Sequence, residues 1–139
     1  MNWYRIAQTR SLLRELESFK PHMAESAQVI YNLWDQDDGI DEEYGSGGIC
    51  DQISQIISDV IVGNIDNVDI IPGGQDGDDH AWIFVKRGRE AFSVDIPPGY
   101  YESGGGYRWE KIPGVIFTPD MIEIFPVNVS DLEDWEDEW

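Results

Sequence analysis

The fold is decided by residues 45–64, which read GSGGICDQISQIISDVIVGN. Apolar side chains recur in this stretch at intervals of three and four, at Cys50, Ile53, Ile56, Ile57, Val60 and Ile61. This spacing is typical of one face of an α-helix, and the strict alternation of a half-buried strand is absent. The sequence therefore predicts a buried helix that begins beside Cys50 and ends at Gly63.

Two further helices are expected within the first 35 residues. The first carries apolar residues near a helical period, at Trp3, Ile6, Leu13, Leu16 and Phe19. A break follows at Lys20-Pro21, because proline is well suited to the first turn of a new helix. In the second helix one apolar stripe is formed by Met23, Ala27, Ile30 and Trp34.

Strands are expected after the central helix. The first candidate covers residues 68–71, a hairpin combines 80–85 with 91–96, and further strands cover 115–117 and 121–127. The fold class is thus α+β, with N-terminal helices and the Cys-bearing helix packed against an antiparallel sheet. We expect one domain over residues 1–130, followed by an acidic tail over 131–139, where six carboxylates stand without a basic residue.

Composition narrows the functional classes. The formal net charge is −19, and such a field repels phosphate backbones and anionic lipid surfaces, so we expect neither nucleic-acid nor membrane binding. No apolar run approaches the about 20 residues that span a bilayer, and no signal peptide is evident, which favours the cytoplasm. A single Cys and two His exclude a Cys/His-rich zinc site, and we expect no metal or cofactor.

Strand pairing within the hairpin suggests a His–carboxylate pair. With Arg87-Gly88 as the two turn residues, His80 lies opposite Asp95, and both share a face with Trp82. Directly paired residues have Cβ atoms about 4.5–5.5 Å apart, so the carboxylate could orient the imidazole through one ring N–H.

Cys50 is the natural partner of that pair. The first turn of a helix favours a thiolate through its N–H groups and dipole, and the Cys50 backbone N–H could stabilise an oxyanion. The glycines before it, Gly48 among them, would let a substrate approach closely. Cys50, His80 and Asp95 therefore make a complete set for nucleophilic catalysis.

Three segments, GSGGICDQIS, DDHAWIFV and FSVDIPP, resemble in order and placement the papain-like and transglutaminase-like cysteine enzyme superfamily, over residues 45–125. The resemblance implies Cys50 as nucleophile, His80 as general base and acid, and Asp95 as the residue that orients it. The superfamily includes peptidases, amidases, deamidases and acyl transferases. No Gln stands shortly before the Cys, so Gln36 or Asn32 would supply any side-chain oxyanion donor.

Several alternatives stay open at the level of sequence. Cys50 is in phase with the isoleucines and could be a small core residue, and His80 could bind Asp95 for stability alone. The aromatic residues of the Gly-rich segment could line a substrate cleft together with Trp82, or simply cover the sheet edge: Tyr100, Tyr101, Tyr107 and Trp109. The acidic loops do not fit the calcium-binding EF-hand pattern.

Two functions follow from these features. The first is a cysteine hydrolase or acyl transferase that acts on an amide, peptide or thioester carbonyl of a protein or peptide substrate. The second is a non-catalytic acidic protein that engages a basic partner or mimics a nucleic acid, as the net charge of −19 and the acidic tail suggest. The two are compatible, because acidity could recruit a basic substrate to a cysteine site.

Overall fold

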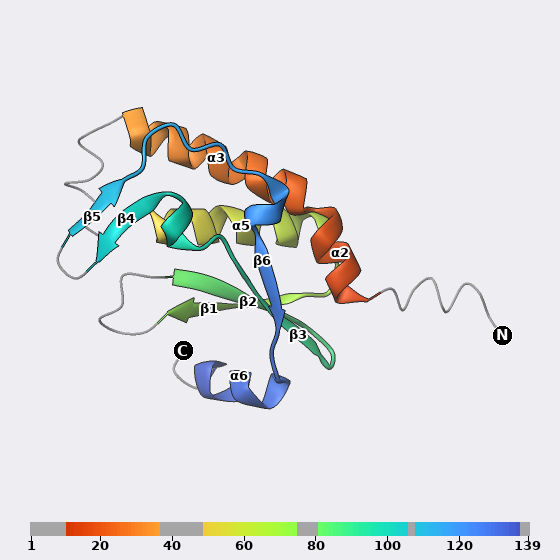
Figure 1. Ribbon diagram of the computed structural model, residues 1–139. Coiled ribbons are helices and arrows are strands. Elements are labelled where there is room, and N and C mark those ends of the chain that lie inside the picture. The colour runs from red at the N-terminus through yellow and green to blue at the C-terminus, as the bar shows by residue number, and fades with distance from the viewer. Residues whose placement is uncertain (1–10, 37–48, 75–80, 106–107, 137–139) are drawn as a thin grey trace.

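The computed structural model describes residues 11–36, 49–74, 81–105 and 108–136, and it shows a mixed α+β protein (Figure 1). The described helices are α2 (Leu12–Ser18), α3 (Lys20–Gln36), α5 (Cys50–Asn64) and α6 (Val129–Glu136). The strands are β1 (Asp69–Gly74), β2 (Ala81–Arg87), β3 (Glu90–Asp95), β4 (Glu102–Gly105), β5 (Arg108–Lys111) and β6 (Glu123–Pro126). Two short 3-10 helices, η2 (Pro98–Tyr100) and η3 (Pro119–Met121), lie in the connections.

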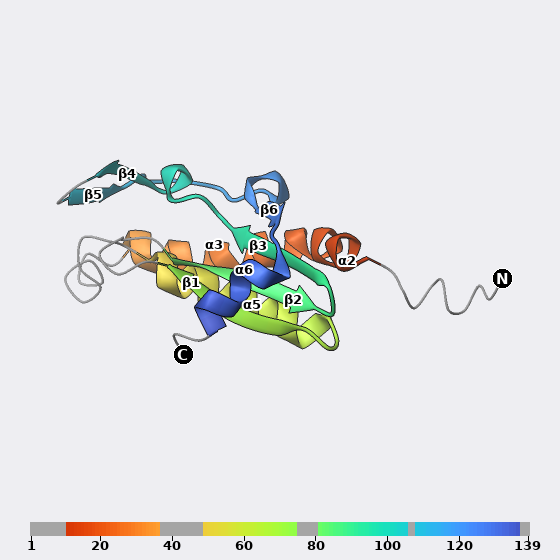
Figure 2. The same ribbon diagram turned by 90° about the horizontal axis from the view of Figure 1, so that it is seen from below.

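The main sheet has the order β1-β2-β3-β6, and each neighbouring pair is antiparallel. Helices α2, α3 and α5 cover one face of this sheet, and α6 lies on the other face (Figure 1 and Figure 2). Strands β4 and β5 form a separate two-stranded sheet. The predicted arrangement of helices against an antiparallel sheet is therefore confirmed.

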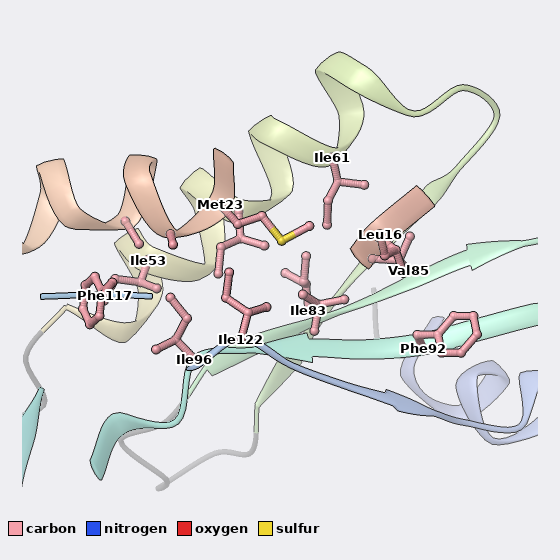
Figure 3. Packing of buried hydrophobic residues seen from close by; sticks show 14 of the residues in the cluster. Leu16, Met23, Ile53, Ile61, Ile83, Val85, Phe92, Ile96, Phe117 and Ile122 are labelled. Carbon is pink, nitrogen blue, oxygen red and sulfur yellow. The ribbon is translucent and has the colours of Figure 1, made fainter. Parts of the chain in front are cut away.

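The core lies between α5 and the sheet. Ile53, Ile57 and Ile61 are buried on one side of α5, as the spacing in the sequence predicts. They pack against the helix-facing side chains of β2 and β3, which include Ile83, Val85, Phe92 and Val94 (Figure 3). The predicted helix begins at Cys50 and ends at Asn64, one residue beyond the expected Gly63.

The N-terminal helices break where the sequence places the break. Helix α2 ends at Ser18 and α3 begins at Lys20, with Pro21 in its first turn. The hairpin tip secures the start of α2, because the Leu12 backbone N–H donates to the Glu90 carboxylate at 3.1 and 3.3 Å. Arg87 also forms an ion pair with Glu15. Residues 1–10, with Trp3 and Ile6, lie outside the described residues.

The hairpin is confirmed, but its predicted register is wrong by two residues. Phe84 pairs with Ser93 instead of Ala91, and Arg87 pairs with Glu90 around a Gly88-Arg89 turn. Gly88 has a φ of 61°, which fits the first central position of a type II′ turn, where glycine is favoured. A shift of two residues leaves every side chain on its expected face.

Residues 115–117 do not form the predicted strand, because side chains of α3 take the place of a strand partner. The Gln28 amide donates to the Val115 carbonyl at 2.9 Å and accepts from the Phe117 N–H at 2.7 Å. The Tyr31 hydroxyl accepts from the Val115 N–H at 3.2 Å. The segment is extended and held by a helix.

Part of the expected acidic tail is helical. Helix α6 covers Val129–Glu136, and Leu132 is only 1% exposed. Leu132 packs with Ile71, Phe84 and Ala91 on the face of the sheet that is turned away from α5. Val127 and Val129 pack against the same cluster, so these apolar side chains dock the segment together with Leu132.

We predict that Gln28→Ala lowers the free energy of unfolding by about 1–3 kcal/mol, because two hydrogen bonds to the 115–117 backbone are lost. Urea denaturation followed by circular dichroism measures the change. Gln55→Ala is the control, since Gln55 is an exposed glutamine on α5. Equal stability of the Gln28 and Gln55 variants would show that the side chain does not hold the segment.

Candidate functional site

Cys50 is the first residue of α5, and its side chain is 7% exposed. It continues the buried face formed by Ile53 and Ile57, so α5 holds the thiol in a fixed place. The residue before it, Ile49, has no side-chain acceptor for the N–H groups of the first helical turn. Those N–H groups give this end of α5 a partial positive charge.

Tyr101 is a buried residue whose phenol responds to the charges of Cys50 and Asp95. Burial raises the pKa of the Tyr101 phenol far above its usual range, and the negative charges of Cys50, Glu102, Asp95 and Asp51 raise it further, in that order.

Aromatic packing holds Tyr101 in this position. The side chain is 1% exposed and makes edge-on contacts with Trp34, at 6.5 Å and 86°, and with Phe117, at 5.9 Å and 87°. Its backbone carbonyl accepts from the Ile112 N–H at 2.9 Å. The neighbouring Glu102 is 1% exposed and pairs across β4–β5 with Lys111. The Lys111 ammonium donates to the Trp34 carbonyl at 3.0 Å.

His80 lies outside the described residues. The direct pairing of His80 with Asp95 rested on the hairpin register that the structure corrects by two residues. Asp95 ends β3 on the face that also bears Ser93 and Phe84, as predicted. The proposed role of His80 therefore stays a prediction.

A groove of about 360 Å³ runs beside Cys50, between α5 and the edge of the sheet. One wall is the polar side of α5, with Asp51, Ser54, Gln55 and Ser58. The other wall comes from β1 and β2, including Ile70, Pro72, Ala81 and Trp82. Asp51, the residue after Cys50 in the sequence, lines the groove, whereas Cys50 is not among the lining residues.

The other predicted site residues have different surroundings. Tyr100 is 41% exposed, whereas Tyr101 is buried in the core, so only Tyr100 could touch a bound molecule at the surface. Trp82 lies over Gly73, where a Cβ atom would overlap its indole, and it forms part of the groove. Gln36 ends α3 and Trp109 lies in β5, but their side chains are outside the description, as is Gly48.

Asn32 does not serve as the alternative oxyanion donor in this arrangement. It is exposed on α3, and its side-chain oxygen accepts from the Gln28 amide at 2.9 Å. Gln28 is itself bound to the 115–117 segment. The backbone N–H of Cys50 is left as the donor that the described residues support.

Two features of the site were missed at the level of sequence. Tyr101 was expected at a cleft wall or sheet edge, and its burial beside Cys50 depends on long-range packing. The polar wall of the groove was also missed, although Asp51, Ser54, Gln55 and Ser58 recur at helical spacing opposite the isoleucine stripe. That pattern could have indicated a solvent-facing wall beside Cys50.

Along the described ranges, no three His, Cys, Asp or Glu side chains converge as metal ligands would. Nor does this part of the chain contain a helix with the length and apolar character needed to cross a membrane.

The chain matches no protein-family model, no curated protein and no solved structure. The function must therefore be argued from the site.

We predict that Tyr101 makes stability fall at alkaline pH. Its pKa is raised in the folded state, so the stabilisation is present below the ordinary tyrosine pKa of 10.0 and declines as the pH rises above it. In urea unfolding between pH 8 and 11, the free energy of unfolding should decline with pH more steeply in the wild type than in Tyr101→Phe. The difference between the two slopes should reach about 1.4 kcal/mol per pH unit. Tyr100→Phe, at the exposed neighbour, should keep the wild-type slope; equal slopes in all three proteins would contradict the prediction.

Proposed function

We propose that this chain is a papain-like or transglutaminase-like cysteine enzyme that hydrolyses or transfers acyl groups from an amide, peptide or thioester carbonyl. The observation that carries the proposal is the position of Cys50, at the first turn of α5 and at the end of its buried face. A groove that begins at the next residue, Asp51, supports it. His80 is the proposed base, on the evidence of the sequence.

The proposed reaction has two stages. His80 takes the thiol proton, the Cys50 sulfur attacks the carbonyl carbon, and the backbone N–H of Cys50 stabilises the oxyanion. The tetrahedral intermediate then expels the amine or thiol, which receives the proton from His80, and a thioester remains on Cys50. Water or another nucleophile loses a proton to His80, attacks this thioester and releases the thiol.

Tyr101 has a supporting place in this scheme. Its phenol stays protonated at all physiological pH values, because its pKa is raised by burial and by the surrounding negative charges. A neutral phenol adds no charge to the cluster and can donate a hydrogen bond. Trp34 and Phe117 pack edge-on against its ring.

The first test measures the reactivity of the thiol. Cys50 is the only cysteine, so alkylation of the whole chain by iodoacetamide reports on this residue alone. At pH 6–7 we expect Cys50 to react faster than a model thiol, because the helix terminus and an imidazolium favour the thiolate. His80→Ala should lower the rate by at least about tenfold, the scale of a lost imidazolium partner.

The chain supplies its own control. His22 is the only other histidine and lies in the first turn of α3, so His22→Ala should leave the rate unchanged. A wild-type rate no greater than that of the model thiol, together with no effect of His80→Ala, would remove the activated nucleophile and with it the proposed function.

The net charge of −19 favours a second candidate, an acidic protein that binds a basic partner. Helix α6 adds to this, since Asp131 is exposed beside the buried Leu132. Salt-sensitive capture of a basic protein that is unchanged in Cys50→Ser would support this candidate. Loss of a biochemical effect in that variant would support the enzyme.

A further inference from the structure

The groove beside Cys50 has the dimensions of a short stretch of extended peptide. Asp51 and Ser58 mark the extent of its α5 wall, and seven residues of helix rise about 10 Å. An extended chain advances about 3.3 Å per residue, so three to four residues fit along this wall. The volume of about 360 Å³ is consistent with a segment of that size.

The two walls differ in chemistry. The α5 wall offers carboxylate, hydroxyl and amide groups, whereas Ile70, Pro72 and Trp82 make the opposite wall largely apolar. An extended chain sends alternate side chains to opposite sides, so a peptide could place a polar residue toward α5 and an apolar one toward the sheet. This arrangement favours a peptide over a uniformly apolar ligand.

The charge of the groove determines which kind of peptide side chain is favoured there. Asp51 is the one ionisable residue among the groove-lining residues that the structure describes. Neither α5 nor β1 contains a lysine or arginine, while Asp59 and Asp69 add further negative charge to them. The nearest cation of β2 is Lys86, which lies three residues (about 10 Å) along the strand from groove-lining Ile83 and pairs in register with Asp69 of β1. A cationic side chain is therefore favoured here and an anionic one is repelled.

The edge of the sheet limits how the peptide lies. Strand β1 is an edge strand, and Pro72 has no N–H, so a partner cannot form a continuous ladder along it. Recognition through side chains in the groove is then more important than backbone pairing.

We propose that this groove binds an extended peptide segment of three to four residues and that Asp51 neutralises a lysine or arginine side chain of that segment. The inference rests on the proposed function, because it names the substrate class of the same cysteine site. Binding itself does not require the chemistry, so the two proposals can fail separately.

The binding test uses the full chain carrying Cys50→Ser, so that no turnover occurs. Fluorescence anisotropy compares three fluorescein-labelled octapeptides, GSVKVKSG, GSVQVQSG and GSVEVESG. We expect the lysine peptide to bind at least about tenfold more tightly than the glutamate peptide, with the glutamine peptide between them. Equal binding of the three peptides, or no binding of the lysine peptide, would overturn the proposal.

Matched variants separate the groove from the overall charge. Asp51→Asn should weaken binding of the lysine peptide about five- to tenfold, and Asp66→Asn, at an exposed turn beyond the other end of α5, should not. Ser58→Arg places bulk and positive charge in the groove and should abolish binding, whereas Val62→Arg adds the same charge at a 59% exposed position outside it. Equal effects within either pair would show that only net charge attracts the peptide.

A second measurement uses the intact thiol. The rate of Cys50 modification is measured with a cationic and with an anionic methanethiosulfonate, and the first rate is divided by the second. Both rates depend on the same fraction of thiolate, so the ratio reports only the preference for one charge. Asp51→Asn should lower this ratio severalfold, and an unchanged ratio would count against a cation site at Asp51. Slow alkylation by iodoacetamide would contradict the proposed function. If the ratio still fell as expected in Asp51→Asn, the proposal of a peptide-binding groove would remain supported.

Discussion

The burial of the isoleucine face of α5 is the constraint on which the structure depends. Ile53, Ile57 and Ile61 are each almost fully buried between the helical layer and the sheet, and each contributes about 1.5–3 kcal/mol by leaving water. Because Cys50 lies in phase with them, the same packing fixes the thiol at the end of the core. A nucleophile placed in this way needs little reorganisation to meet a substrate, which is the condition for efficient covalent catalysis.

The segment that carries Tyr101 is held in place by hydrogen bonds that begin at α3. The Tyr31 hydroxyl donates to the Ile112 carbonyl, and the Ile112 N–H donates to the Tyr101 carbonyl at 2.9 Å. Gln28 secures the following 115–117 segment in the same manner. Helix α3 thus serves as a partner for irregular backbone, which explains how a glycine-rich segment with only a two-stranded sheet can keep Tyr101 beside Cys50.

Patterns within single elements were predictable from the sequence, and relations between elements were less so. The helical stripe of α5, the break before Pro21 and the hairpin follow from local periodicity and turn residues. The register was wrong because glycine was placed second in the turn, although a Gly-X pair at Gly88-Arg89 suits a type II′ turn equally well. The segment 115–117 has strand-like side chains, and only the positions of Gln28 and Tyr31 in space show why it has no strand partner.

Electrostatics joins the two proposals. The carboxylates of Glu102, Asp95 and Asp51 all act on the Tyr101 phenol near Cys50, and like charges oppose a thiolate in the same place. The N-terminal end of α5 offsets part of this field, but neither α5 nor β1 supplies a lysine or arginine. Lys111 lies opposite Glu102 across β4–β5, and we expect any further cation to come from the imidazolium of His80 or from a basic side chain bound at Asp51. A basic peptide in the groove would then favour the thiolate as well as deliver the carbonyl, so an acidic surface is compatible with a cysteine nucleophile when the substrate is itself positively charged.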